Sequence, residues 1–375
     1  MIKFDWLVVG AGLTGLTFAE RMASRFGRKV MVIDRRSHLG GNTFDAPNEH
    51  GILTHVYGPH IFHTNSQKVW DYLSVFTRWR PYEHRVLGLV EGSWIPIPFN
   101  LTSIDRVFDS GEAAQIKEML VAQYGFGAKV PILDLKQCAQ PRLQALAGFV
   151  YEHVFLHYTR KQWELEPEDL DAAVTARVPV FVSHDDRYFQ DTYQAMPQGG
   201  YGEMARRMAD VTGVEVHLGM SHLDAMQGVA FDRMFFTGRI DEYFDFELGR
   251  LPYRSLRFQH ETLSVDRFQT TGTHNYPGLE PFTRITEQKT LTGQVLNGKT
   301  GIVTEYPVAH KEGENEPYYP IPREENRALY QRYADLAARK APNVVFAGRL
   351  GDYQYYNMDQ AVARALMLSE KMGAV

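Results

Sequence analysis

Residues 6–34, WLVVGAGLTGLTFAERMASRFGRKVMVID, decide the fold of this chain. The apolar run 7–9 predicts a short buried strand, and the glycine-rich turn 10–15 leads into a helix over residues 16–26. Gly27 is placed to end that helix, and residues 29–34 (KVMVID) predict a second buried strand. A strand, a helix and a second strand in this order predict a parallel α/β sheet.

The glycines of this turn have a spacing that is typical of dinucleotide binding. Gly10 makes the tight turn, Gly12 lets the backbone approach a pyrophosphate, and Gly15 allows the helix to pack closely. The helix N-terminus would then face the phosphates, and Asp34 could accept a hydrogen bond from a ribose hydroxyl. The plain alternative is a strand–turn–helix without a nucleotide, but strand, helix, spacing and acid agree on the dinucleotide.

Other glycines favour FAD over NAD. A second glycine pair, Gly40-Gly41, follows Asp34 closely, where FAD enzymes contact ribose and pyrophosphate. The segment 348–352 (GRLGD) near the other end of the chain also fits one FAD. The chain has no second GxGxxG motif for NAD(P)H, so we expect one FAD and not two dinucleotides.

Composition limits the possible functions. A chain of 375 residues is expected to form two or three packed units. Its net charge of −5 offers no general attraction to nucleic acid or to an anionic membrane, so any anion must meet local arginine or lysine. The lone Cys138 cannot form an intrachain disulfide, and the sequence contains no signal peptide or membrane span. We therefore expect a cytoplasmic protein.

The middle of the chain alternates between helical and strand patterns. Helices are expected over 110–124, with Ser110 as the N-cap, and through the amphipathic stretch 146–157. A hairpin turning at Glu91-Gly92 and the alternating stretch 256–269 predict an antiparallel sheet. The closing strand 343–347 and helix 358–372 are expected to return to the first domain.

Several motifs allow both a functional and an ordinary interpretation. The loop 55–64 holds three histidines, but Gly58-Pro59 prevents a helix and no cysteine is near, so a metal site is disfavoured against a structural loop or one lying on a flavin. The acidic run 164–171 around Pro167 is either a helix start or a lid. Arg177 and Arg284 would each be ordinary surface arginines if considered singly. Tyrosines gather at 318–319 and 353–356, more densely than is usual in exposed loops.

Taken together, ten ordered motifs resemble the UDP-galactopyranose mutases of the bacterial type, essentially from end to end. The matching motifs are GAGLTG, IDRRSHLGGN, HVYGPHIFHT, YTRKQW, RVPVFVSHDDRYF, MPQGGY, GRLPYRSL, FTRITE, PYYPI and GRLGDYQYYNMD. The resemblance implies an α/β fold with a discontinuous Rossmann-like FAD-binding domain (1–80, 190–237 and 320–375). It also implies an inserted helical domain (98–176, with a mobile substrate loop at 164–176) and an inserted antiparallel β-sheet domain (81–97, 177–189 and 238–319).

The resemblance further implies an isomerase that interconverts UDP-galactopyranose and UDP-galactofuranose without net redox change and supplies galactofuranose for cell-surface glycans. In that family the reduced flavin N5 attacks the anomeric carbon, UDP departs, and an iminium allows the sugar ring to open and close again. The chain itself shows no nucleophilic serine or cysteine elbow, which agrees with a nucleophile supplied by the cofactor. Partners would be the two UDP-sugars and an unidentified flavin reductant, and the resemblance implies a homodimer.

Site residues follow from the resemblance position by position. The residues implied in catalysis are Arg177, Arg284 and His60. The residues implied in FAD binding are Gly10, Gly12, Leu13, Thr14, Gly15, Asp34, Arg35, Gly41, Asn42, His60, Arg349, Tyr356 and Met358. The residues implied in substrate binding are His84, Phe155, Thr159, Trp163, Arg177, Tyr188, Asn275, Arg284, Tyr319, Arg349 and Tyr355. No metal is implied.

Two positions depart from the family pattern. His84 stands where some members carry asparagine, and Asn357 stands where some carry aspartate, which affects the expected substrate contacts and not the reaction. Two other classes share the FAD fold: flavin amine oxidases or desaturase-like oxidoreductases, and dissociation inhibitors that bind a prenylated GTPase without flavin. Neither accounts for YTRKQW or GRLGDYQYYNMD.

Overall fold

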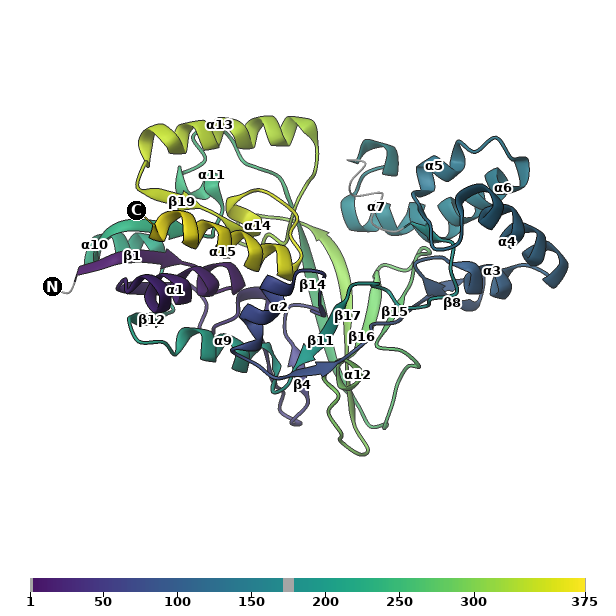
Figure 1. The fold of residues 1–375 in the computed structure, drawn as a ribbon, viewed down its shortest axis with the longest axis horizontal. Helices are drawn as coiled ribbons and strands as arrows, with labels where there is room; N and C mark the ends of the chain where they lie inside the picture. Colours follow the sequence, from purple (N-terminus) through teal and green to yellow (C-terminus); the bar gives the residue numbers. More distant parts are fainter. Residues whose placement is uncertain (1–2, 171–178, 375) are drawn as a thin grey trace. The chain divides into compact units, whose positions relative to one another are not determined.

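A computed structural model describes residues 3–170 and 179–374 (Figure 1). The chain forms two compact units: residues 1–82, 191–253 and 316–375 make up the first, and residues 83–190 and 254–315 make up the second. The division into three domains remains a prediction. Residues 238–253, which we assigned to the sheet domain, lie in the first unit, because Ile240 and Leu251 pack against Tyr333 in a shared apolar cluster.

The first unit is built on a parallel five-stranded sheet in the order β12-β2-β1-β13-β19. These strands are β1 (Lys3–Val9), β2 (Val30–Asp34), β12 (Val214–Leu218), β13 (Ala230–Phe236) and β19 (Val344–Phe346). On one face of the sheet Phe18 of α1 (Leu13–Phe26) stacks on Phe235, and on the other Ala225 of α10 (His222–Gly228) joins the cluster around Leu7. Helices on both faces confirm the predicted α/β class with its Rossmann-like strand–helix–strand unit.

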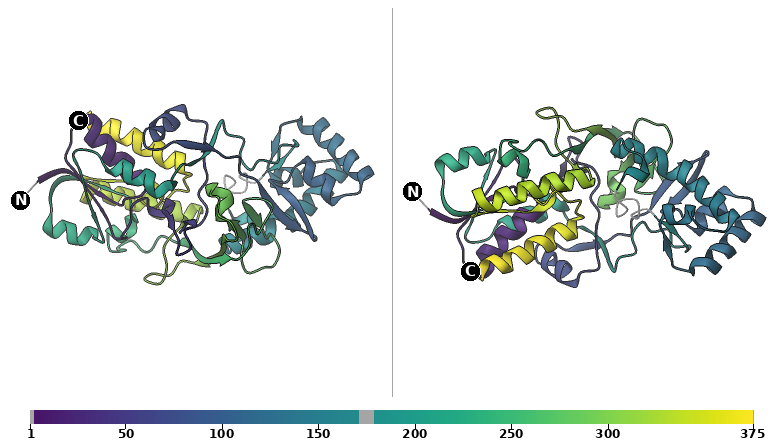
Figure 2. Two further views of the ribbon diagram at one scale, coloured as in Figure 1. Left: turned by 90° about the horizontal axis from the view of Figure 1, so that it is seen from below. Right: turned by 90° about the horizontal axis from the view of Figure 1, so that it is seen from above.

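The C-terminal segment completes this unit as expected. Helix α15 (Met358–Gly373) lies against α1, and Figure 2 shows the two side by side, in yellow and purple. The strand expected at 343–347 is β19, and α14 (Gly348–Gly351) follows it. The remaining elements of the unit are η1 (Gly41–Thr43), β3 (Asp45–Pro47), β4 (Leu53–His55), β5 (Phe62–Thr64), α2 (Gln67–Ser74), β6 (Trp79–Pro81), β11 (Tyr193–Pro197), α9 (Gly200–Ala209), α11 (Ile240–Tyr243), β18 (Tyr319–Pro320) and α13 (Glu324–Lys340).

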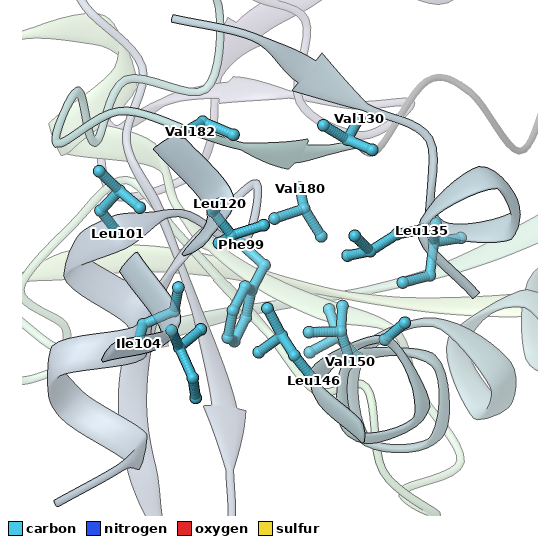
Figure 3. Packing of buried hydrophobic residues seen from close by; sticks show 14 of the residues in the cluster. Phe99, Leu101, Ile104, Leu120, Val130, Leu135, Leu146, Val150, Val180 and Val182 are labelled. Carbon is cyan, nitrogen blue, oxygen red and sulfur yellow. The ribbon is translucent and has the colours of Figure 1, made fainter. Parts of the chain in front are cut away.

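The helical part of the second unit encloses its own apolar core. Figure 3 shows Phe99 among leucine, isoleucine and valine side chains from several helices, together with Val180 and Val182. The elements are α3 (Leu101–Val107), α4 (Ser110–Tyr124), β9 (Lys129–Val130), α5 (Ile132–Lys136), α6 (Pro141–Val150), the π-helix η2 (Tyr151–Leu156), α7 (His157–Trp163), η3 (Pro167–Asp169) and β10 (Val180–Phe181). The helix predicted at 110–124 is confirmed, but Ser110 is its first residue and Asp109 is the N-cap.

An antiparallel sheet forms the rest of the second unit. The hairpin predicted at residues 91–92 is confirmed: Glu91 and Gly92 have φ angles of 48° and 79°, so both central residues have positive φ, as a type I′ turn requires. The strands run in the order β14 (Tyr253–Leu263), β17 (Thr300–Ala309), β16 (Arg284–Glu287), β15 (Thr273–Asn275), β7 (Val86–Val90) and β8 (Ser93–Ile97), and α12 (Gln288–Thr292) follows β16. Only the β15–β7 pairing among these is parallel. Within the described part of the chain, no helix is long and apolar enough to cross a membrane.

Candidate functional site

The glycine turn after β1 forms a tight cradle at the carboxyl edge of the parallel sheet. Gly10 N–H donates to the Ile33 carbonyl at 2.8 Å, and Gly40 N–H donates to the Ala11 carbonyl at 2.8 Å. Gly10 has a φ of 105°, which disfavours any side chain there, and a Cβ at Gly15 would lie 1.9 Å from the Gly10 carbonyl oxygen. These glycines are therefore fixed by the fold itself.

Gly12 differs from its neighbours because the fold leaves space beside it. It precedes α1 in an extended conformation (φ −78°), and the nearest atom to a Cβ built there is Gly41 Cα at 3.8 Å. No side chain caps α1 and its first turn has no acid, so its first backbone N–H groups, from Leu13 onward, can receive an anion. An open cradle over a helix N-terminus fits the pyrophosphate of a dinucleotide.

Asp34, at the end of β2, has its carboxylate partly occupied by the loop around it. It accepts hydrogen bonds from Ala11 N–H at 2.8 Å and Arg36 N–H at 2.9 Å. The neighbouring Arg35 forms an ion pair of 2.5 Å with Glu316, and Arg36 Nη1 donates to Asn42 Oδ1 at 2.9 Å. Each carboxylate oxygen keeps a further lone pair, which is the group that a ribose hydroxyl needs.

The C-terminal segment contributes an arginine and a tyrosine pair to the first unit. Arg349 Nη2 donates to the Tyr356 carbonyl at 2.8 Å, and its guanidinium lies 5.3 Å from the ring centre of Tyr319 and 5.4 Å from that of Tyr355. The two rings stack at 5.1 Å. Next to the cradle, a Cβ at Gly348 would lie 3.2 Å from Thr14 Oγ1, so this segment closes on the start of α1. Met358 begins α15.

His60 lies half-buried in the loop between β4 and β5, also in the first unit. Its Nδ1 lies 2.9 Å from the Gly58 carbonyl oxygen, and its backbone N–H donates to His55 Nδ1 at 3.1 Å. Burial, with a smaller contribution from Arg349, lowers the pKa of His60 to about 4. The imidazole is therefore neutral near pH 7.

The second unit contains a largely apolar pocket that is partly open to solvent. It is lined by Ile97, Val154, Phe155, Tyr158, Thr159, Trp163, Leu170, Tyr188, Asn275 and Pro277. Five of these, Phe155, Thr159, Trp163, Tyr188 and Asn275, are residues that the sequence predicts as substrate contacts. The Asn275 Oδ1 is buried and accepts no hydrogen bond from the described residues, so it is placed to accept one from a ligand.

The π-helix η2 sets the direction of the pocket's aromatic wall. It interrupts the helical run between α6 and α7, and a π-helix adds about one residue per turn to the α-helical count. The side chains that follow are thereby rotated about the helix axis, and Phe155, Tyr158, Thr159 and Trp163 line one pocket. The predicted helical stretch 146–157 is confirmed in extent, but its regular α-helical periodicity is wrong.

Arg284 is connected to this pocket by a hydrogen bond to Tyr158, one of the lining residues. Its Nη2 donates to Tyr158 Oη at 3.0 Å, and its Nε lies 3.2 Å from Oε1 of the buried Glu305. Tyr158 lines the pocket, and Arg284 is bonded to it without being one of the lining residues. Sequence reasoning missed Tyr158, although it opens the motif YTRKQW that supplied its neighbour Thr159.

The C-terminal end of α7 is held by two cations. The buried Arg254 donates from Nε to the Gln162 carbonyl at 2.9 Å and forms an ion pair of 2.7 Å with Glu164. Lys161 Nζ donates to the carbonyls of Tyr276 at 2.6 Å and Phe282 at 3.0 Å. These bonds fix the helix against the loop that carries Pro277, and cations are favoured at a helix C-terminus.

Three further positions named from the sequence are not among the described residues that line the pocket, and their roles stay predictions. His84 is buried behind the pocket, where its ring packs edge-on against Tyr188 at 5.9 Å and is not among the lining residues. Asn357 precedes α15, and its N–H donates to Gln360 Oε1 at 2.9 Å. Arg177 lies outside the described residues, as do positions 171–176 of the predicted loop. Within the run 164–171, for which the sequence allowed a helix start or a lid, Pro167–Asp169 form a short 3₁₀ turn.

The described residues contain no group of three or more histidine, cysteine, aspartate or glutamate side chains placed to hold a metal ion. In the loop 55–64, His63 instead contacts Asp191, with Nδ1 2.9 Å from Oδ2.

Sequence comparisons give this arrangement a context. The sequence model of the GLF: UDP-galactopyranose mutase family matches residues 153–355, and that of the NAD(P)-binding Rossmann-like domains matches residues 8–76. A probable UDP-galactopyranose mutase of Klebsiella pneumoniae is 34% identical over 97% of this chain and 94% of its own length. A dTDP-fucopyranose mutase of Escherichia coli is 30% identical, covering 96% of both chains.

Solved structures agree at the level of the fold. A reduced UDP-galactopyranose mutase superposes with a TM-score of 0.76 at 16% identity, covering 100% of this chain and 95% of that one. A putrescine oxidase redesigned in its cofactor binding gives a TM-score of 0.61 at 12% identity, covering all of both chains. Both matches fall below the identity at which structural likeness indicates shared chemistry, so they speak for the fold alone.

Proposed function

Because the chain belongs to the UDP-galactopyranose mutase family, we propose that it interconverts UDP-galactopyranose and UDP-galactofuranose with FAD as its cofactor. The observation that carries this proposal is the pocket of the second unit, where five predicted substrate residues line one space. A family relationship that covers nearly the whole chain supports the same substrate class.

We place FAD on the cradle of the first unit. Gly12 and the start of α1 would receive the pyrophosphate, and Asp34 would accept from a ribose hydroxyl. Bound and reduced, FAD supplies the nucleophile that an isomerisation at the anomeric carbon requires. His60 and Arg349 would lie beside the cofactor, and a neutral His60 adds no competing charge there.

The chain's own residues would bind UDP and stabilise it as it leaves. Phe155 and Trp163 offer aromatic walls for the uridine, and Asn275 Oδ1 offers it a hydrogen-bond acceptor. Arg284, together with Arg177, would neutralise the diphosphate. Glu305 holds one edge of the Arg284 guanidinium, so the charge is oriented before substrate arrives.

A second substrate pair deserves a direct comparison, because one relative is a dTDP-fucopyranose mutase at 30% identity. We favour the UDP pair since the family model and the more similar relative both carry the UDP-galactopyranose name. The two pairs differ in the base methyl group, the ribose 2′-hydroxyl and the sugar 6-hydroxyl, and pockets discriminate such groups through individual contacts.

The test is an anaerobic assay with dithionite-reduced protein, in which UDP-galactofuranose and dTDP-fucofuranose are supplied separately and products are resolved by chromatography. We expect kcat/KM for the UDP pair to exceed that for the dTDP pair by at least about tenfold. The Arg284→Ala variant is the control for turnover at this site. A preference for the dTDP pair would overturn the substrate assignment and leave the mutase reaction standing.

A further inference from the structure

A buried histidine stands behind His60. His55, at the end of β4, is 1% exposed, and its Nδ1 accepts the backbone N–H of His60 at 3.1 Å. His55 pairs across β3–β4 with Asp45, and the edge of the Tyr201 ring covers it at 5.7 Å. Two side chains and one backbone N–H group thus surround an imidazole that no step of the proposed reaction uses.

The contacts of His55 determine its tautomer. Burial lowers the pKa of His55 to about 3, so its ring is neutral near pH 7. A neutral ring whose Nδ1 accepts a hydrogen bond must carry its proton on Nε2. His55 Nε2 lies 3.8 Å from Asp45 Oδ2, which is beyond the distance of a direct hydrogen bond, so the neutral ring lies beside the carboxylate and forms no ion pair with it.

Asp45 is itself fixed by the N-terminus of α9. Its two carboxylate oxygens accept from the N–H groups of Tyr201 and Gly202, each at 2.8 Å. A Cβ at Gly200 would lie 2.6 Å from Asp45 Oδ1, and one at Gly202 would lie 2.7 Å from the Asp45 carbonyl oxygen. The glycines of MPQGGYG therefore make room for this carboxylate, which lies beside the His55 ring.

His60 has the opposite tautomer. Its ring is neutral, and the Gly58 carbonyl beside Nδ1 can only accept, so the proton of His60 is on Nδ1. Its Nε2 is left with a lone pair. The backbone N–H and the ring of His60 are thus both fixed, the first by His55 and the second by Gly58.

We propose that His55 is a positioning residue: buried beside Asp45 and Tyr201, it fixes the backbone of His60 so that His60 presents an acceptor Nε2 to the flavin ring. This inference rests on the proposed function only in placing His60 beside the flavin. The arrangement of Asp45, His55 and His60 belongs to the first unit alone and is independent of which nucleotide sugar is bound.

The experiment compares three variants of the full-length, FAD-loaded protein. His55→Leu fills the buried site with an apolar side chain and removes the hydrogen-bond acceptor. His55→Asn restores an acceptor oxygen close to the position of Nδ1. His222→Leu is the matched control, because His222 is a partly buried histidine in the same unit that packs on Phe236 and Tyr243. The measurements are the ¹⁵N shifts of the His60 ring, the visible spectrum and midpoint potential of the flavin, and kcat and KM.

For His55→Leu we expect the His60 ring shifts to lose their single-tautomer pattern, the flavin spectrum and midpoint potential to change, and kcat to fall on the order of 10–100-fold with KM within about twofold. His55→Asn should recover most of each change, and His222→Leu should show none. If His55→Leu does not fold, the test uses His55→Asn alone. A His60 ring in that variant that titrates near its ordinary pKa would overturn the proposal.

Failure of the positioning role of His55 and failure of the proposed mutase function would give different experimental results. If wild-type protein shows no mutase activity, the function is wrong, yet the His60 shifts and the flavin spectrum still judge the role of His55. If His55→Leu leaves both of these unchanged, or if His55→Asn is no better than His55→Leu, the positioning role is wrong even when the wild-type protein is an active mutase.

Discussion

At the scale of single residues, glycines with similar spacing have different roles in the dinucleotide cradle. Gly15 is required by the fold, because a Cβ there would lie 1.9 Å from the Gly10 carbonyl oxygen. Gly12 is not, because the nearest atom to its Cβ is 3.8 Å away and its backbone is extended. A substitution at Gly15 therefore tests folding, whereas a substitution at Gly12 tests cofactor binding.

We predict that Gly12→Ala retains the fold and loses FAD. Its methyl group would occupy the space over the α1 N-terminus, and we expect FAD affinity to fall more than about tenfold, equivalent to ~1.4 kcal/mol. Flavin content after gel filtration and the melting temperature of the apoprotein measure the two effects. Gly111→Ala, on the open surface of α4, is the control. Retention of full flavin in Gly12→Ala would contradict this role.

Arg284 is the residue through which we test the diphosphate contact. Arg284→Ala should keep its FAD and lose on the order of 10²–10³ in kcat, because it removes charge that stabilises the departing diphosphate. Tyr158→Phe is the matched variant: it removes the hydroxyl at 3.0 Å from Arg284 and leaves the charge, so its loss should be smaller. Loss of flavin from Arg284→Ala would show that its role is misassigned.

At the scale of elements, periodicity predicted the parallel sheet, the hairpin and the terminal helices but not the π-helix. Residues 151–156 carry the same amphipathic pattern as the helices beside them, so the local pattern does not distinguish a π-helical turn from an α-helical one. The same limit explains why Tyr158 was missed, because the rotation of the helix that brings it to the pocket wall is invisible in the local pattern.

Deletion of the exposed Glu152 tests the π-helix. Without the extra residue, the segment can form α-helical hydrogen bonds, which would turn the following helix by about 100° and move Thr159 and Trp163 out of the pocket wall. We expect affinity for UDP, measured by calorimetry, to fall at least about tenfold with flavin content unchanged. Glu152→Ala should bind UDP normally. Normal binding by the deletion variant would contradict the role of the π-helix.

At the scale of the whole molecule, buried neutral histidines link folding to pH. The pKa values of His55, His60 and His274 are lowered to about 3, 4 and 4, chiefly by burial. Below the ordinary pKa of about 6.5, each is protonated in the unfolded chain and not in the folded one, so acid favours unfolding. Both units contain such a group.

We therefore predict that the free energy of unfolding of FAD-saturated protein falls as the pH decreases from about 6.5 towards 4. Each histidine contributes up to about 1.4 kcal/mol per pH unit to this fall, and the three together contribute up to roughly 4 kcal/mol per pH unit. Urea unfolding at about pH 7 and pH 5 measures the slope, and His274→Gln should reduce it by about one third. A flat profile over this interval would contradict the neutral state of these rings in the folded protein.

The central claim is an isomerisation without net redox change, and its most direct test approaches equilibrium from both sides. Reduced protein is incubated anaerobically with UDP-galactopyranose in one sample and UDP-galactofuranose in the other, and the nucleotide sugars and the reductant are both quantified. We predict that the two samples converge on one ratio and that a single reduction of the flavin supports many turnovers. No interconversion, or reductant consumed in proportion to product, would contradict the account.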